Sequence, residues 1–474
     1  TDRAIDLTQG SMLGNLVRMS LPIMLANFMQ TFYNLTDVWW LGKLGETAKE
    51  AVAAVGLTFP IVFFLSSFGF GFVVAGTAMV ARFKGAGELD KIKKTVGQYT
   101  FLLLVFTGGF ILISLFLIGP ILQLLQVPDE IYSVTRDYLR LIMFGMVFMF
   151  IFISYQGIAH GLGDTATPMK IQVVSILLNV FLDPVFIFGL WIFPRSGAVG
   201  AGYATLIARI LAAGIAIYSM KRNAPELIPK LSDIRPDWPF IRNMIRLALP
   251  ASIGQSITSF GFVLLQGFVN TFGTVVISIF SIGNRMTGIF MMPAMGISNA
   301  LSAIIGQNLG AKNVKRAEKS VRIAAAFVLA IMLVGCSIIF FFGASLTKFF
   351  INDPAVIEIG VRMFRVSSIA TFVFSVLFIF IGVFNGAGQT QATMFLNVAR
   401  LWAFRIPFVL ILSGIAVKYV SGSFLEPAAI ALAKPLADHP YDALWWSMIF
   451  SNTITSVMAF IFYKTGRWKK SEIE

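Results

Sequence analysis

The sequence predicts an all-α integral membrane protein with twelve transmembrane helices in two six-helix lobes. Three observations lead to this fold class. Hydrophobic residues make up 57% of the 474 positions and charged residues 13%, which is about half the charged share of a soluble domain, and the mean hydropathy is +0.81. Long apolar runs recur along the whole chain, and the second half repeats motifs of the first.

The apolar runs are each long enough to cross a bilayer, which takes roughly 20 residues in a helix. In the first half the expected spans lie at 14–41, 51–82, 96–118, 133–158, 169–193 and 199–220. In the second half they lie at 241–270, 276–307, 322–345, 359–384, 393–417 and 443–464. We therefore expect a lobe at 1–220, a linker at 221–240 and a lobe at 241–474.

The distribution of Lys and Arg predicts the orientation in the membrane. These residues gather in alternate loops and at the carboxyl end, at 82–94, 170, 221–235, 312–319 and 464–470. Cytoplasmic loops carry this excess, so both termini are expected in the cytoplasm of a cell (plasma) membrane protein. Because the net charge of +14 comes from these short clusters, it does not indicate a nucleic-acid partner.

Three pairs of motifs show that the halves repeat each other. Residues 17–22 (VRMSLP) match 245–250 (IRLALP), 228 positions later. Residues 85–94 match 310–319 and residues 160–169 match 385–394, each 225 positions later. Two halves of the same topology form a parallel repeat about an axis along the membrane normal, an architecture of alternating-access transporters.

The polar residues of the fifth span are the strongest sign of function. Asn179 and Asp183 interrupt the apolar stretch Leu177–Phe188, and Pro184 follows directly. Their four-residue spacing places both side chains on one helix face, and a carboxylate at bilayer depth costs about 2.5–3.5 kcal/mol and by default marks a functional site. A neutral Asp bonded to a neighbouring helix is the structural alternative. Pro184 disfavours helical geometry at Asp183 and predicts a hinge.

The repeat breaks at the acidic residues. Asp37 lies in the first span, and its counterpart is Leu265; Asp183 falls opposite Ile406 or Phe408. Membrane carboxylates are therefore expected in the first lobe only. If the first and fifth spans are neighbours, Asp37 and Asp183 share a cavity where they bind a cation or where one of them carries a proton.

The sixth span adds small and polar residues. Gly200 and Gly202 allow close helix approach, and Thr205 offers a hydroxyl that serves either as a ligand or as a back-bond to its own helix. Arg209 follows one turn later, as a counter-ion to a carboxylate or as a side chain that extends to the interface.

The second lobe has buried polar residues without acids. We expect the charged ones to be structural and held by helix carbonyls; the whole set is Gln255, Gln266, Asn284, Arg285, Asn299, Arg400 and Arg405. Met286, Met291, Met292 and Met295 form either an adaptable surface for apolar ligands or ordinary core.

Several of these elements together resemble the multidrug and toxic compound extrusion (MATE) family. The resemblance covers nearly the whole chain. It depends on Leu-Pro near the start of each lobe, on Tyr33–Asp37 (YNLTD), on the Gly-x-Gly loops at 161–163 and 386–388, on Asn179–Pro184 (NVFLDP) and on Ala204-Thr205. Arg285 and Arg400 also lie where the family tends to keep an arginine.

The resemblance implies a drug antiporter with two six-helix bundles in a V, which exchanges Na⁺ or H⁺ for amphipathic organic cations. It places the cation site on Asp37, Asn179, Asp183 and Thr205. A substrate cavity is expected from Tyr33, Asn34, Gln255, Met286, Met291 and Met292. Because the second lobe lacks membrane carboxylates, the chain resembles the DinF-like branch.

The same residues leave other function classes open. A flippase for lipid-linked sugars of the same superfamily requires a basic cavity, which Arg209, Arg285, Arg400 and Arg405 make conceivable. Gly161–Asp164 (GLGD) matches intramembrane aspartyl proteases, with Asp442 as second acid, but the repeated loop has Gln389 instead. A channel is a further alternative.

No enzyme activity or cofactor is expected beyond the coupling ion, H⁺ or Na⁺. Cys336 stands alone, and His160 and His439 are far apart in sequence, which disfavours a Cys/His metal site. The expected partners are membrane lipids and small cationic substrates, with the protein acting as a monomer.

Overall fold

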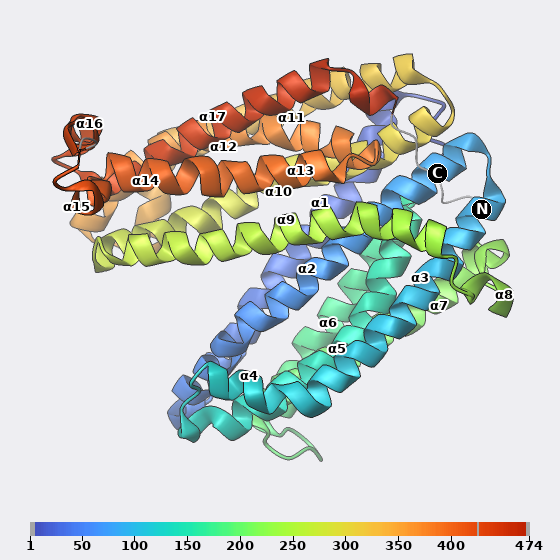
Figure 1. Cartoon of the computed structure of the whole chain (residues 1–474). Coiled ribbons are helices and arrows are strands. Elements are labelled where there is room, and N and C mark those ends of the chain that lie inside the picture. Colours follow the sequence, from blue (N-terminus) through green and yellow to red (C-terminus); the bar gives the residue numbers. More distant parts are fainter. Residues whose placement is uncertain (1–4, 424–425, 471–474) are drawn as a thin grey trace. The chain divides into compact units, whose positions relative to one another are not determined.

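The computed structural model describes the backbone of residues 5–423 and 426–470, and their side chains except those of residues 34–35, 60, 68, 110, 114–115 and 418–420. This described part consists of helices and their connections, without a strand (Figure 1). It divides into two compact units. Unit 1 comprises residues 1–252 and 303–313, and unit 2 comprises residues 253–302 and 314–472.

The long helices follow the predicted runs. The helices of the first half are α1 (Met12–Gly42), α2 (Ala48–Ala86), α3 (Leu89–Leu112), α4 (Ile118–Leu124), α5 (Asp129–Gly161), α6 (Ala166–Phe188) and α7 (Gly197–Asn223). Those that follow are α8 (Leu231–Ile234), α9 (Trp238–Asn270), α10 (Thr274–Gly310), α11 (Val314–Phe350), α12 (Pro354–Gly386), α13 (Thr390–Val398), α14 (Ile406–Leu412), α15 (Ile415–Val420), α16 (Glu426–Ala433) and α17 (Ala443–Lys464).

Within the described residues, eleven helical segments are long and apolar enough to cross a membrane. The twelfth expected run, 96–118, coincides with α3, the π-helical segment Ile113–Leu117 and the start of α4. The second-lobe run 393–417 is likewise interrupted, by the π-helical segment Ala399–Arg405 between α13 and α14. The all-α membrane fold class is confirmed.

The sequence repeat is visible in the backbone of equivalent turns. At the end of α5, the Asp164 N–H donates to the Ala159 carbonyl at 2.8 Å, and at the end of α12 the Gln389 N–H donates to the Phe384 carbonyl at 2.7 Å. Gly163 and Gly388 both have positive φ, at 85° and 77°. Since equivalent residues are 225 apart, the two Gly-x-Gly loops end their helices in the same way.

A second pair of equivalent turns shows where the copies differ. The Glu88 N–H donates to Phe83 O at 2.9 Å, and the Asn313 N–H donates to Asn308 O at 2.8 Å. The residue before each donor has positive φ, 74° at Gly87 and 57° at Lys312. The first copy fills this left-handed position with glycine, which adopts it without steric cost, and the second copy with lysine, which does not.

The amino-terminal segment is held by residues from distant parts of unit 1. The Leu7 N–H donates to Gln307 Oε1 at 3.0 Å, and Asn308 Nδ2 donates to the Leu7 carbonyl at 3.1 Å. Gln307 also donates to the Gly161 carbonyl at 2.8 Å, and Lys84 donates to the carbonyl of Ile5. The end of α10 therefore belongs to unit 1 and completes it.

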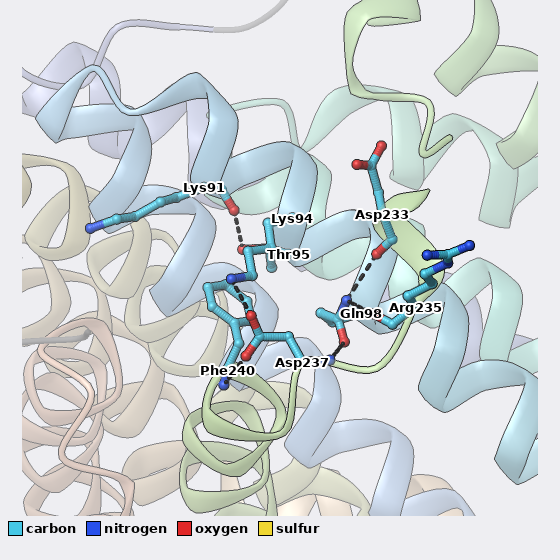
Figure 2. Close-up of polar contacts among 8 residues, drawn as sticks. All are labelled: Lys91, Lys94, Thr95, Gln98, Asp233, Arg235, Asp237 and Phe240. Atoms are coloured by element: carbon cyan, nitrogen blue, oxygen red, sulfur yellow. Dashed lines mark hydrogen bonds and ion pairs between the residues drawn. The ribbon is translucent and has the colours of Figure 1, made fainter. Parts of the chain in front are cut away.

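The basic segment after α7 is fixed to α3 by a cluster of polar contacts (Figure 2). Gln98 Nε2 donates to the carbonyls of Asp233 and Arg235, each at 2.8 Å, and Gln98 Oε1 accepts from the Asp237 N–H at 3.0 Å. A Cβ added at Gly97 would lie 2.3 Å from the Asp233 carbonyl oxygen. This segment is therefore a docked part of unit 1.

Asp237 connects this segment to the start of α9. Its carboxylate pairs with Lys94 and accepts the Phe240 N–H at 3.1 Å, in the manner of an N-cap (Figure 2). The ion pair with Lys94, followed by the backbone hydrogen bond, lowers the pKa of Asp237 below its ordinary value.

Candidate functional site

Helices α1, α6 and α7 bring the four predicted cation-site residues together in unit 1. α6 packs against both α1 and α7. Ser175 on α6 donates to the Ala208 carbonyl on α7 at 2.8 Å, and Gln172 on α6 bonds Gln30 on α1 at 3.1 Å. A Cβ at Gly200 would lie 2.4 Å from the Phe186 carbonyl oxygen, which confirms that glycine permits the predicted close approach.

Asn179 lies at the centre of this site. With its amide oriented to satisfy its neighbours, Nδ2 lies 3.2 Å from Asp183 Oδ2 and 3.2 Å from Asp37 Oδ1. Its Oδ1 accepts from the Thr205 backbone N–H at 3.1 Å. One amide group therefore bridges the two carboxyl groups, and its oxygen points away from them.

The site is buried on the side of α6 and α7 and half-buried on α1. Asp183 is 0% exposed, Asn179 1% and Thr205 5%, whereas Asp37 and Tyr33 are half-buried. Tyr33 on α1 places its hydroxyl 3.2 Å from Thr205 Oγ1 and within hydrogen-bond reach of Asp37. The sequence placed Tyr33 in a substrate cavity; here it contacts the carboxylate cluster directly.

Two neighbouring side chains complete the electrostatic environment. Arg209 on α7 donates to the Ile142 carbonyl on α5 at 3.3 Å and lies within electrostatic range of Asp37. Tyr138 on α5 lies within the same range of both carboxyl groups. Sequence reasoning missed Tyr138 because only tertiary packing brings α5 to this site; no motif marks it.

One oxygen atom of the site remains without a donor. Asp183 Oδ1 is buried and has no hydrogen-bond partner among the described residues. Two ionised carboxylates that face each other in a low dielectric repel strongly, so one of them takes up a proton or a cation lies between them. The unpartnered oxygen is where such a proton or ion fits.

Pro184 does not break its helix, contrary to the expected loss of helical geometry at Asp183. α6 runs unbroken from Ala166 to Phe188, with Pro184 inside it. Packing against α1 and α7 holds this segment, and neighbouring helices make proline tolerable in transmembrane helices. The hinge role of Pro184 stays a prediction.

The remaining predicted cavity residues with described side chains belong to unit 2. Gln255, Met286 and Met292 in unit 2 are half-buried, and Met291 is 4% exposed. Met286 packs against the unit 2 core around Ile279 and Phe280. The side chain of Asn34 lies outside the described part of the chain.

The expectations for the second-lobe polar residues need correction. Asn284 and Arg285 are exposed, because their positions on α10 face away from the packed core of unit 2. Arg400 and Arg405 are buried, at 4% and 3% exposure, but aromatic rings take the place of the expected helix carbonyls. The Arg400 guanidinium lies 4.3 Å from the centre of the Phe374 ring, and that of Arg405 5.5 Å from Phe262.

Both acids of the protease alternative have structural partners. Asp164 Oδ1 accepts the Thr167 N–H at 2.9 Å and its other oxygen accepts the Thr167 hydroxyl, both in the first turn of α6. Asp442 forms an ion pair with Arg362 of α12. These contacts argue against a catalytic role for either residue.

Comparison with known proteins gives one consistent family. The protein named "Probable multidrug resistance protein YpnP" from Bacillus subtilis is 27% identical over 471 residues, covering 99% of both chains. An "FAD transporter" from Shewanella oneidensis is 23% identical over 444 residues, covering 89% of this chain and 97% of its own.

A solved structure, the "Outward-facing conformation of a multidrug resistance MATE family transporter of the MOP superfamily", has a TM-score of 0.84 at 22% identity, covering 99% of both chains. The MatE family model matches residues 22–185 and 250–411, one stretch in each half of the repeat. The chain belongs to the MatE family of membrane transporters.

Proposed function

We propose that this protein is a multidrug efflux antiporter, which exports amphipathic organic cations in exchange for H⁺ by alternating access. The observation that carries the proposal is the pair of buried Asp183 and half-buried Asp37, with Asn179 between them. The names of the Bacillus relative and of the solved structure, which speak of multidrug resistance, support the substrate class.

The orientation of the Asn179 amide distinguishes H⁺ from Na⁺ as the coupling ion, and we propose the orientation that suits a proton. In that orientation the amide presents its N–H groups to both carboxyl groups and its oxygen to the Thr205 N–H. An amide N–H repels a metal ion, whereas it stabilises a carboxyl pair that shares one proton. In the opposite orientation, Nδ2 lies 3.4 Å from Thr205 Oγ1 and the amide oxygen joins the carboxylate oxygens of Asp37 and Asp183 as hard ligands for Na⁺.

The proposed cycle uses the charge of this pair. When it is deprotonated, the two carboxylates attract a cationic substrate; when it takes up a proton, this attraction weakens and the substrate leaves. The contact between the hydroxyl groups of Tyr33 and Thr205 keeps the Tyr33 side chain oriented beside Asp37. Pro184 is the proposed point at which α6 bends during the change of access.

The proposed function requires a location and an orientation in the membrane. We place it in the plasma membrane as a monomer in contact with lipids, with both termini and the segment 221–240 on the cytoplasmic side between the lobes 1–220 and 241–474. The loops rich in Lys and Arg support this orientation.

The test is uptake of a fluorescent cationic dye into inverted vesicles, driven separately by a pH gradient and by a Na⁺ gradient. We expect uptake with the pH gradient alone, and its loss in Asp183→Asn. The matched control is Asp438→Asn, because Asp438 is exposed and has no place in the mechanism. Uptake that follows only the Na⁺ gradient would show that Na⁺, and not H⁺, is the coupling ion. Equal uptake by wild type and Asp183→Asn would refute the role of the Asp37–Asp183 pair.

A flippase for lipid-linked sugars is the second candidate. The observation that favours it is the pair of buried arginines in unit 2, Arg400 and Arg405, which no acid among the described residues of that unit accompanies. Absence of dye movement under either gradient, together with transbilayer movement of a labelled lipid pyrophosphate, would select this function instead.

A further inference from the structure

Arg400 and Arg405 occupy an irregular segment of unit 2. They belong to the π-helical segment Ala399–Arg405, which joins α13 to α14 in one line (Figure 1). A π-helix connects residues five apart, so the two guanidinium groups lie close enough to repel each other. Such segments are rare and frequent at functional sites.

Both side chains are buried without complete hydrogen bonding. The Nε of Arg400 and the Nε and Nη2 of Arg405 have no partner among the described residues. The rings of Phe374 and Phe262 contact the guanidinium groups of Arg400 and Arg405. An aromatic ring attracts the cation, but it accepts none of these in-plane N–H groups.

Each described acid of unit 2 either has a hydrogen-bond or ion-pair partner other than these arginines or is exposed. Asp442 pairs with Arg362, Glu318 pairs with Lys469, Asp353 caps α12 and Glu426 accepts the Gly422 N–H. Glu358 and Asp438, the other described acids of this unit, are exposed. The two guanidinium groups are therefore buried positive charges without a counter-charge from the described part of their own unit.

We propose that Arg400 and Arg405 form a binding site for an oxyanion, the carboxylate or phosphate group of an organic anion or of a lipid. A guanidinium group binds such groups with two parallel N–H donors, and it stays charged at neutral pH. This site is separate from the Asp37–Asp183 pair in residues and in sign of charge. It extends the function beyond cation export to recognition of a negatively charged group.

A merely structural role for these arginines predicts a different behaviour. Removing one partner of a satisfied buried network is strongly destabilising. Removing a buried charge that lacks a counter-charge also removes the cost of its desolvation, so we expect such a variant to unfold no earlier than wild type. The variants Arg405→Gln and Arg400→Gln therefore distinguish the two roles by stability as well as by binding.

The experiment measures thermal unfolding of the purified full-length protein in detergent against increasing pyrophosphate, and separately against increasing citrate. Two further samples are reconstituted in phosphatidylcholine alone and with phosphatidylglycerol. The matched control is Arg365→Gln, which removes the same charge from an exposed position on α12. The Asp183→Asn variant is measured in parallel to separate this site from the coupling site.

We expect pyrophosphate or citrate to raise the unfolding temperature of wild type, Arg365→Gln and Asp183→Asn. In Arg405→Gln the half-saturating concentration rises about tenfold or more, as for loss of one bidentate pair, while the protein without anion unfolds no earlier than wild type. Stabilisation by phosphatidylglycerol alone, lost in the same variant, would assign the site to a lipid head group.

Two outcomes would overturn the proposal. One is the absence of stabilisation by either the soluble anions or the anionic lipid. The other is an equal anion response in Arg405→Gln and Arg365→Gln. A lower unfolding temperature of Arg405→Gln without anion, combined with either outcome, would establish the structural role. Because dye uptake is not measured here, these outcomes are independent of the proposed antiport.

Discussion

At the scale of single residues, the turn after α5 depends on the absence of a side chain. Gly163 has a φ of 85°, and an added Cβ would lie 2.4 Å from the Ile5 carbonyl oxygen. Gly163→Ala should lower the free energy of unfolding by about 1–3 kcal/mol through backbone strain, seen as a lower unfolding temperature. Gly108→Ala is the control, since nothing lies within 4 Å of its added Cβ. Equal stability of both variants would contradict this reading.

Asp237 gives a pH-dependent prediction. Because the Lys94 ion pair lowers the pKa of Asp237 in the folded protein, its contribution is present above the unfolded pKa of about 3.9 and is lost as pH falls through the folded value. Asp237→Asn should therefore unfold slightly earlier than wild type at neutral pH, by a fraction of a kcal/mol for an exposed pair. Melting curves at several pH values should converge in acid; a constant difference would contradict it.

Residues also show the limit of sequence reasoning at the site. Asn179 and Asp183 stood out because polar groups are costly in an apolar run, and the structure places them beside Asp37 and Thr205. Tyr138 could not be found, since its presence there depends on how α5 packs. The prediction that Asn284 and Arg285 are buried was wrong, because an apolar run does not reveal which face of the helix packs against the core.

At the scale of elements, Gln98 holds the basic segment after α7 through three hydrogen bonds. Gln98→Ala removes all three, so residues 228–237 should be cleaved faster by trypsin, which cuts after Lys230. Gln123→Ala, an exposed position on α4, is the control. Unchanged cleavage of the Gln98 variant would show that the contacts of Gly97 and Lys94 suffice.

The helices themselves were largely predictable, and their irregularities were not. Apolar runs and their length are properties of the sequence, so the runs at 133–158 and 359–384 correspond to α5 and α12. Proline drew attention to residue 184, yet α6 is unbroken there. The π-helical segments Ile113–Leu117 and Ala399–Arg405 have no such marker, because side-chain packing decides which carbonyl each N–H meets.

At the scale of the whole molecule, the repeat makes the differences between the two halves informative about ligand binding. Equivalent turns such as those at Gly163 and Gly388 keep their backbone hydrogen bonds, whereas the charges differ: unit 1 has buried Asp183 and unit 2 has buried Arg400 and Arg405. The duplication preserved what folds the chain, and the differences lie where ligands of opposite charge are proposed to bind.

The contacts of Leu7 have a consequence for biosynthesis. Residues near the start of the chain bond to Gln307 and Asn308 across 300 positions, and such distant pairings form late and slowly. During translation, the first lobe therefore leaves the ribosome before Gln307 and Asn308 have been synthesised. Its contacts with them form only after most of α10 has been made. A fragment that stops at residue 252 would leave the Leu7 amide and the Gly161 carbonyl without the partners they have here.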